Sequence, residues 1–151
     1  MAGELIENPQ IGDIESAALR DFFETWTSQF SEGELPKSRN FSLTVFAQHL
    51  PLMVQSDYDA KAGRFFVKYY GSQYGEGVGA DYTNHFVDEI PNAQDLLARS
   101  MRLVESKQPY LLLGNKVTWS PKNFRHYSAI ACPLFDDMKD VSSILFRIEF
   151  C

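Results

Sequence analysis

Three histidines and two cysteines are the side chains of this sequence most able to bind a metal or act as a nucleophile: His49, His85, His126, Cys132 and Cys151. Their spacing lacks the CxxC and HxxxH patterns of zinc sites, so no metal site is predicted. His49 is expected at the surface or as a cap near the end of a short helix. Cys132 lies in a strand-like run and is expected to be a small buried hydrophobic residue. Cys151 is expected to be an exposed terminal thiol.

A small cone-shaped α+β enzyme, such as an isomerase or a dehydratase, is one alternative for this chain. Such an enzyme needs a carboxylate or histidine with a shifted pKa inside a closed cavity. The candidates are Asp81, His85 and His126. Nucleophilic catalysis has little support, because Cys132 has no evident partner and a pair such as Ser128 with His126 arises easily by chance. The sequence favours a protein without catalytic activity.

The stretch from residue 63 to residue 90 is the most distinctive part of the chain. It begins as a strand in which alternation places Phe65, Val67 and Tyr69 on one face and Phe66, Lys68 and Tyr70 on the other. Four glycines follow at close spacing: Gly71, Gly75, Gly77 and Gly79. The phosphate-loop pattern GxxxxGK[ST] is absent, and the glycines do not form GxGxxG before a helix. They are therefore predicted to serve a turn region and a close approach of the backbone.

Periodicity predicts the elements that position these residues. Apolar residues at helical spacing indicate helices over 14–30, 42–50 and 92–106, and a short helical segment over 84–90. Alternating segments indicate strands over 52–58, 64–70, 110–119, 124–133 and 142–150. Neighbouring strands joined by short turns form antiparallel sheets, so the expected class is α+β. The domain boundaries are a flexible N-terminus over 1–12, an N-terminal helix over 13–31 and one domain over 32–151.

The order and spacing of several short motifs resemble a family of bacterial PAS domains found mostly in alphaproteobacteria. The matching residues are Leu35, Pro36, Arg39, Leu50, Pro51, Arg64, Phe65, Gly71, Gly79, Asp81 and Thr83. The resemblance runs from about residue 19 to the C-terminus, and it departs from the family at Lys68, usually an arginine, and at Asn84, usually a glycine. It implies a PAS fold, a five-stranded antiparallel sheet of order 2-1-5-4-3 with flanking helices and an N-terminal helical extension.

The resemblance also implies a function. PAS modules are sensory or interaction domains of bacterial signal transduction, so the expected partner is a signalling protein such as a two-component regulator, or a small apolar ligand. A ligand pocket is expected between the sheet and residues 74–90, with Asp81 and Asn84 holding the turn. The expected lining residues are Tyr70, Tyr74, His85, Phe86, Met101 and Trp119. No cofactor is expected, with haem bound through His85 as an alternative. A third alternative is a structural adaptor with a filled core.

A flavin photoadduct would need a cysteine in the helical segment after the second predicted strand. Residues 82–90 contain none, so photoadduct chemistry is excluded.

The predicted helix over 14–30 has a broad aromatic stripe, and two functions suit it. It can cover the sheet of its own chain, or it can form a homodimer interface through Ile14, Ala18, Phe22 and Trp26. Large aromatic side chains dominate the energetics of both arrangements.

Charge and composition exclude several classes of protein. The formal net charge of −6 does not favour binding to nucleic acid or to an anionic membrane surface. No apolar run approaches the length of a membrane span. The N-terminus has neither the basic start nor the apolar stretch of a secretory signal. A cytoplasmic location is therefore expected.

Overall fold

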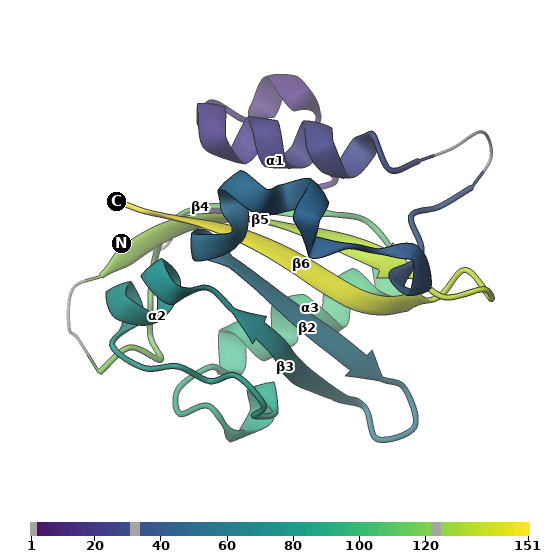
Figure 1. Ribbon diagram of the computed structural model, residues 1–151. Helices are drawn as coiled ribbons and strands as arrows, with labels where there is room; N and C mark the ends of the chain where they lie inside the picture. The colour runs from purple at the N-terminus through teal and green to yellow at the C-terminus, as the bar shows by residue number, and fades with distance from the viewer. Residues whose placement is uncertain (1–2, 31–33, 122–124) are drawn as a thin grey trace.

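The computed structural model describes residues 3–30, 34–121 and 125–151, which form three layers. The middle layer is an antiparallel sheet (Figure 1). Helix α1 (Ala17–Thr27) and the 3-10 segment η3 (Leu43–Leu52) lie on one face of it. Helices α2 (Ser72–Val78) and α3 (Gln94–Ser106) lie on the other face. Each face buries its own hydrophobic cluster, so the sheet is covered on both sides.

Six antiparallel strands form the sheet, in the order β1-β4-β5-β6-β2-β3. Their bounds are β1 Glu4–Glu7, β2 Met53–Asp59, β3 Arg64–Tyr70, β4 Tyr110–Lys116, β5 His126–Phe135 and β6 Val141–Phe150. Strands β2 to β6 are the five predicted strands in the predicted order, so the PAS-type sheet is confirmed. Phe124, where one strand was expected to begin, lies outside the described residues.

The N-terminal segment differs from the prediction. Residues 1–12 were expected to be flexible, but Glu4–Glu7 forms the edge strand β1 and pairs with Tyr110–Leu113 of β4. The short segment has only two apolar residues, so its own periodicity is weak. Its conformation depends on backbone pairing with a strand more than a hundred residues later, which sequence periodicity does not reveal.

Two irregularities change which side chains share a face. Gln55 of β2 pairs with Tyr69 of β3, and the next residue of β2, Ser56, pairs with Val67. Lys68 of β3 therefore has no partner in β2 and forms a β-bulge. Tyr70 consequently faces the same cluster as Val67, and not the opposite one as strict alternation predicts. In β4, Gly114 has a φ of 61° at a break in the register. Strict alternation along the strand predicted over 110–119 would place Leu111 and Trp119 on one face. Trp119, which follows the end of β4, instead packs in the cluster on the opposite face from Leu111.

The helical segments also depart from the predictions in places. The glycine region was expected to be turn, but α2 forms there and ends at Gly79, which has a φ of 87°. The segment predicted over 84–90 shortens to the 3-10 turn η4 (Val87–Glu89). Two further 3-10 turns are η1 (Ile11–Asp13) and η2 (Ser38–Asn40). The predicted N-terminal helix over 13–31 contains α1, and residue 31 lies outside the described residues.

Helix α1 covers the sheet of its own chain, so three of the four residues expected at a dimer interface are buried within the chain. Phe22 is fully buried, and Trp26 and Ile14 are 5% and 1% exposed. The indole Nε1 of Trp26 donates a hydrogen bond to the carbonyl oxygen of Pro133 in β5 at 2.9 Å. Ala18 is only partly buried. Side chains held in this way inside one chain cannot serve as anchors for a second copy.

A buried polar chain joins α1 and η3 to the sheet. Arg147 Nε in β6 donates to His49 Nδ1 at 2.9 Å, and His49 Nε2 lies 2.7 Å from Asp21 Oδ2 in α1. Because Nδ1 accepts this bond, the proton of the neutral imidazole is on Nε2 and is donated to Asp21. His49 is 4% exposed, so its expected position at the surface is corrected. Burial lowers the pKa of His49, and the bond to Asp21 only partly offsets that effect.

The lowered pKa of His49 predicts a loss of stability at mildly acidic pH. The folded pKa lies below the unfolded value of about 6.5, so the unfolded chain binds more protons below that pH. The contribution of His49 to the free energy of unfolding is therefore complete above pH 6.5. It decreases as the pH falls, by at most about 1.4 kcal/mol per pH unit for one proton. Urea unfolding measured from about pH 7.5 to about pH 5 should show this slope.

The control for this prediction is His49→Gln, whose amide can accept from Arg147 and donate to Asp21 without titrating. Its stability should be flat over the same pH range. Glu7 and Asp88 also have lowered pKa values, through Arg102 and Arg64, but their contribution is lost only below their ordinary values of about 4. An equal slope in the wild type and the glutamine variant would contradict the assignment to His49.

Candidate ligand-binding site

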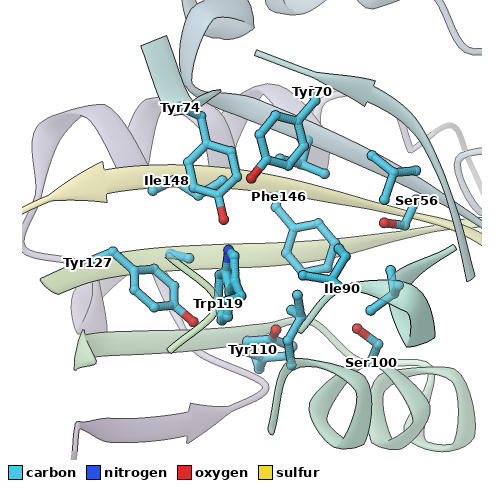
Figure 2. Close-up of a pocket in the computed structure, with 15 residues that line it drawn as sticks. Ser56, Tyr70, Tyr74, Ile90, Ser100, Tyr110, Trp119, Tyr127, Phe146 and Ile148 are labelled. Carbon is cyan, nitrogen blue, oxygen red and sulfur yellow. The ribbon is translucent and has the colours of Figure 1, made fainter. Parts of the chain in front are cut away.

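The candidate site is a small cavity between the sheet and the layer of α2, η4 and α3. Its volume is about 30 Å³, which is close to the space one water molecule takes in the liquid. Figure 2 shows the side chains around it. They are Val54, Ser56, Val67, Tyr70, Tyr74, Val87, Ile90, Leu96, Ser100, Tyr110, Trp119, Tyr127, Ala129, Phe146 and Ile148. The wall is mainly apolar, with a few hydroxyl groups and one indole N–H.

Four tyrosines give the cavity its polar character. They come from different elements: Tyr70 from β3, Tyr74 from α2, Tyr110 from β4 and Tyr127 from β5. Burial raises the pKa of each phenol above its ordinary value, so all four are neutral near pH 7 and can donate hydrogen bonds. A molecule bound in this cavity would therefore contact neutral hydrogen-bond donors and apolar side chains.

The hydroxyl of Tyr70 is buried and has no hydrogen-bond partner. The phenol ring lies 4.7 Å from that of Tyr74, between ring centroids. Figure 2 shows the hydroxyls of Tyr70 and Tyr74 and the indole nitrogen of Trp119 directed toward the same space. The hydroxyl of Tyr74 and the indole N–H of Trp119 lie near enough to affect the pKa of Tyr70, but neither forms a hydrogen bond of ordinary geometry with its hydroxyl. An unpaired buried hydroxyl costs free energy, so this group is a strong candidate for contact with a ligand.

The hydroxyl of Tyr127 contrasts with that of Tyr70 because it has a partner. Arg99 of α3 donates from Nη2 to Tyr127 Oη at 2.8 Å. Trp119 contacts the Tyr127 ring edge-on, with centroids 5.5 Å apart. Tyr127 therefore fixes α3 to β5 at one end of the cavity.

The structure brings together only part of the predicted set of lining residues. Tyr70, Tyr74 and Trp119 line the cavity. Phe86 lies outside it, with its ring 3.7 Å from the guanidinium carbon of Arg64. Met101 packs against the core without lining the cavity. His85 is exposed and does not line it, so the geometry does not offer His85 as a haem ligand there.

Sequence reasoning missed most of the sheet's contribution to the lining. The missed polar and aromatic residues are Ser56, Tyr110, Tyr127 and Phe146 of the sheet and Ser100 of α3. Strict alternation along the strand predicted over 124–133 places Tyr127, Ala129 and Ala131 on one face, and in the structure all three belong to the same cluster. This alternation does not indicate which face of the sheet α2 and α3 cover.

The three candidates for acid–base chemistry do not meet in the cavity. Asp81 and His85 are exposed, His126 is partly buried, and none of the three lines the cavity. Asp81 instead holds the turn after α2, because its Oδ1 accepts from the backbone N–H of Thr83 at 2.9 Å. Asn84 continues this turn with a φ of 68° and donates from its N–H to the carbonyl oxygen of Val67 at 2.8 Å. Among the described residues, no three histidine, cysteine or acidic side chains group as metal ligands.

Comparisons with known proteins agree with the fold. No protein-family model matches the chain, and no curated protein matches it. The solved structure of an RNA-binding light-oxygen-voltage receptor is similar, with a TM-score of 0.50 and 9% sequence identity. The match covers 79% of this chain and 36% of that one, so this chain corresponds to about a third of that receptor. Light-oxygen-voltage domains are PAS-family domains, and the chain has a PAS-like fold. No helix among the described residues is long and apolar enough to cross a bilayer.

Proposed function

We propose that the chain is a non-catalytic PAS-type sensory module that binds a small, mainly apolar molecule in the cavity of Tyr70 and Tyr74. The observation that carries this proposal is the buried Tyr70 hydroxyl without a partner at an apolar cavity. A ligand with a hydrogen-bond acceptor beside an apolar body would satisfy that donor and cover the walls. Fold similarity supports a sensory role only in general, because function has to be argued from the site.

The size of the cavity implies that binding changes the conformation. A volume of about 30 Å³ leaves room for about one water, so a larger molecule must displace part of the wall. Helix α2, which contributes Tyr74 to the wall, is short and contains Gly75 and Gly77. A ligand that binds the expanded form better would shift the population toward it. Such a shift is the means by which occupancy could reach a signalling protein, for which the resemblance to bacterial PAS modules implies a two-component regulator.

RNA is a weaker candidate partner for this chain. The similar receptor is described as RNA-binding, whereas the net charge here is −6. Affinity for nucleic acid comes largely from basic side chains that contact phosphates.

The proposal is tested by a matched pair of Tyr→Phe variants. Tyr70→Phe removes an unpaired hydroxyl, so the ligand-free protein should become more stable by about 1 kcal/mol. Tyr127→Phe removes the partner of Arg99, so the protein should become less stable by about 1 kcal/mol. Urea unfolding followed by circular dichroism measures both changes.

A screen of small aromatic acceptors by thermal shift and ligand-observed NMR supplies the second measurement. Any molecule that binds in the cavity should lose affinity in Tyr70→Phe, although that variant is the more stable protein. If Tyr70→Phe is destabilised like Tyr127→Phe, its hydroxyl is already paired and the proposal loses its basis. If no molecule in a broad screen binds with sensitivity to Tyr70, the structural adaptor becomes the better interpretation.

A further inference from the structure

A second cavity, of about 180 Å³, lies between β1, α3 and the connection from α3 to β4. Its apolar wall is formed by Leu5, Leu103, Pro109 and Tyr110, and its basic groups are Arg99 and Arg102. The backbone of Asn8 donates to the carbonyl oxygen of Pro109 at 2.9 Å and holds the N-terminal segment over this space. The cavity thus combines an apolar wall with two guanidinium groups.

Arg99 is the unusual member of this site. Its side chain is partly withdrawn from solvent, and its Nε–H is buried without a hydrogen-bond partner. The ion pairs among the described residues do not include it. The bond from its Nη2 goes to Tyr127 Oη, which is uncharged. Burial opposes the charge of Arg99, but Tyr127, Tyr110 and Asp95 offset this effect and leave its pKa raised. Asp95 lies beyond ion-pair distance, so the guanidinium group still has room for a carboxylate in direct contact.

Arg102 shows which kind of anion the site can accept. It lies three residues after Arg99 and therefore on the same side of α3. It contacts the carboxylate of Glu7 in β1 at two points, through Nε to Oε1 and through Nη2 to Oε2 at 3.0 Å. This two-point contact is the geometry in which guanidinium groups recognise carboxylates. The protein's own glutamate therefore occupies a carboxylate position at the edge of the cavity.

We propose that this cavity is a binding site for a small aromatic monocarboxylate. The ring lies among Leu5, Leu103, Pro109 and Tyr110, and the carboxylate contacts the guanidinium group of Arg99 and replaces Glu7 on Arg102. The size fits, because a cavity of about 150 Å³ is enough for benzene. Among the residues that line the cavity, two arginines and one glutamate leave a single positive charge for one carboxylate, while Asp95 and Glu105 interact with the two arginines from outside the lining.

The site is distinct from the cavity of Tyr70, although Tyr110 lines both cavities. Arg99 also bonds Tyr127 of the first cavity. Tyr70 lines only the first cavity and Glu7 only the second, so variants at these two positions test the sites separately.

The test is calorimetric titration of the full chain with benzoate, and with benzamide as the uncharged analogue. Benzoate should bind saturably and benzamide about tenfold more weakly, the size expected when a bond to a charged group is lost. Arg99→Met should weaken benzoate binding by about tenfold or more for the same reason. Glu7→Gln removes the competing carboxylate and should strengthen benzoate binding.

Two variants serve as controls for this test. Glu4→Gln makes the same change on β1 at a residue that does not line the cavity, and Tyr70→Phe alters only the first cavity. Both should bind benzoate as the wild type does. Tighter binding in Glu7→Gln cannot arise from unfolding, so it supports the proposal even if Arg99→Met is poorly folded. Equal binding of benzoate and benzamide, weaker binding in Glu7→Gln, or no saturable binding of benzoate to the wild type would overturn it.

Discussion

Replacing Phe22 with alanine is expected to lower the free energy of unfolding by about 3–5 kcal/mol, which is the usual cost of removing a buried phenylalanine. Phe22 is fully buried where α1 meets η3, and its ring lies 4.9 Å from that of Phe46 and 5.5 Å from that of His49, between centroids. The loss is a large part of the stability of a typical domain, about 5–15 kcal/mol. Urea unfolding followed by circular dichroism measures it.

The matched control is Phe30→Ala, near the same end of the chain. Phe30 is 38% exposed, and its main ring contact is an edge-on one with Trp26. Its loss should be about 1 kcal/mol, the size of one aromatic pair. Light scattering should show that the folded fraction of Phe22→Ala has the same mass as the wild type. A variant that keeps full stability but changes mass would restore Phe22 to an intermolecular interface.

Replacing Gly71 with alanine should also be strongly destabilising, by about 1–3 kcal/mol or more. An added Cβ would lie 2.4 Å from the carbonyl oxygen of Pro51 and 2.5 Å from that of Leu50. Both obstacles are backbone atoms, which move less readily than the end of a side chain. Gly71 also donates from its N–H to the carbonyl oxygen of Met53 at 2.8 Å, so a shift would break the bond that positions α2.

Gly75→Ala is the control, because it makes the same change four residues later inside α2. The nearest atom to its added Cβ is the carbonyl oxygen of Ala80 at 3.6 Å, an ordinary contact. Alanine is favoured over glycine within a helix by about 0.5–1 kcal/mol, so this variant should be neutral or more stable. Equal losses in the two variants would mean that α2 tolerates no side chain at either position and that the contact with η3 is not the cause.

The strands and the long helix were predictable because their signals are local. The alternation along residues 141–150 predicts β6, and the helical spacing after Asn92 predicts α3. Features that depend on distant partners were not predictable. The bulge at Lys68, which directs Tyr70 toward the cavity, arises from pairing with β2 and has no local signature.

The candidate site was predicted in part for the same reason. Tyr70 and Tyr74 lie in the region that the glycine pattern distinguished, and Trp119 ends the strand predicted over 110–119. Tyr110 and Tyr127 belong to strands whose inner face is set by the packing of α3. Arg99 and Glu7, the basis of the second cavity, lie far apart in the sequence, and nothing in the spacing of either residue indicates the other.

The sixth strand also has a kinetic consequence. The pairing of Glu4–Glu7 with Tyr110–Leu113 closes a loop of more than a hundred residues for only four residue pairs. Contacts between residues so far apart in the sequence form late and at a high cost in conformational entropy. Strand β1 should therefore be the last to join the sheet during folding and the first to detach in local unfolding. While β1 is detached, the backbone of Leu111, Leu112 and Leu113 becomes a free sheet edge rich in leucine. Edges of this kind pair readily with strands of other chains. By pairing with β4 in the native state, β1 therefore protects this edge from aggregation.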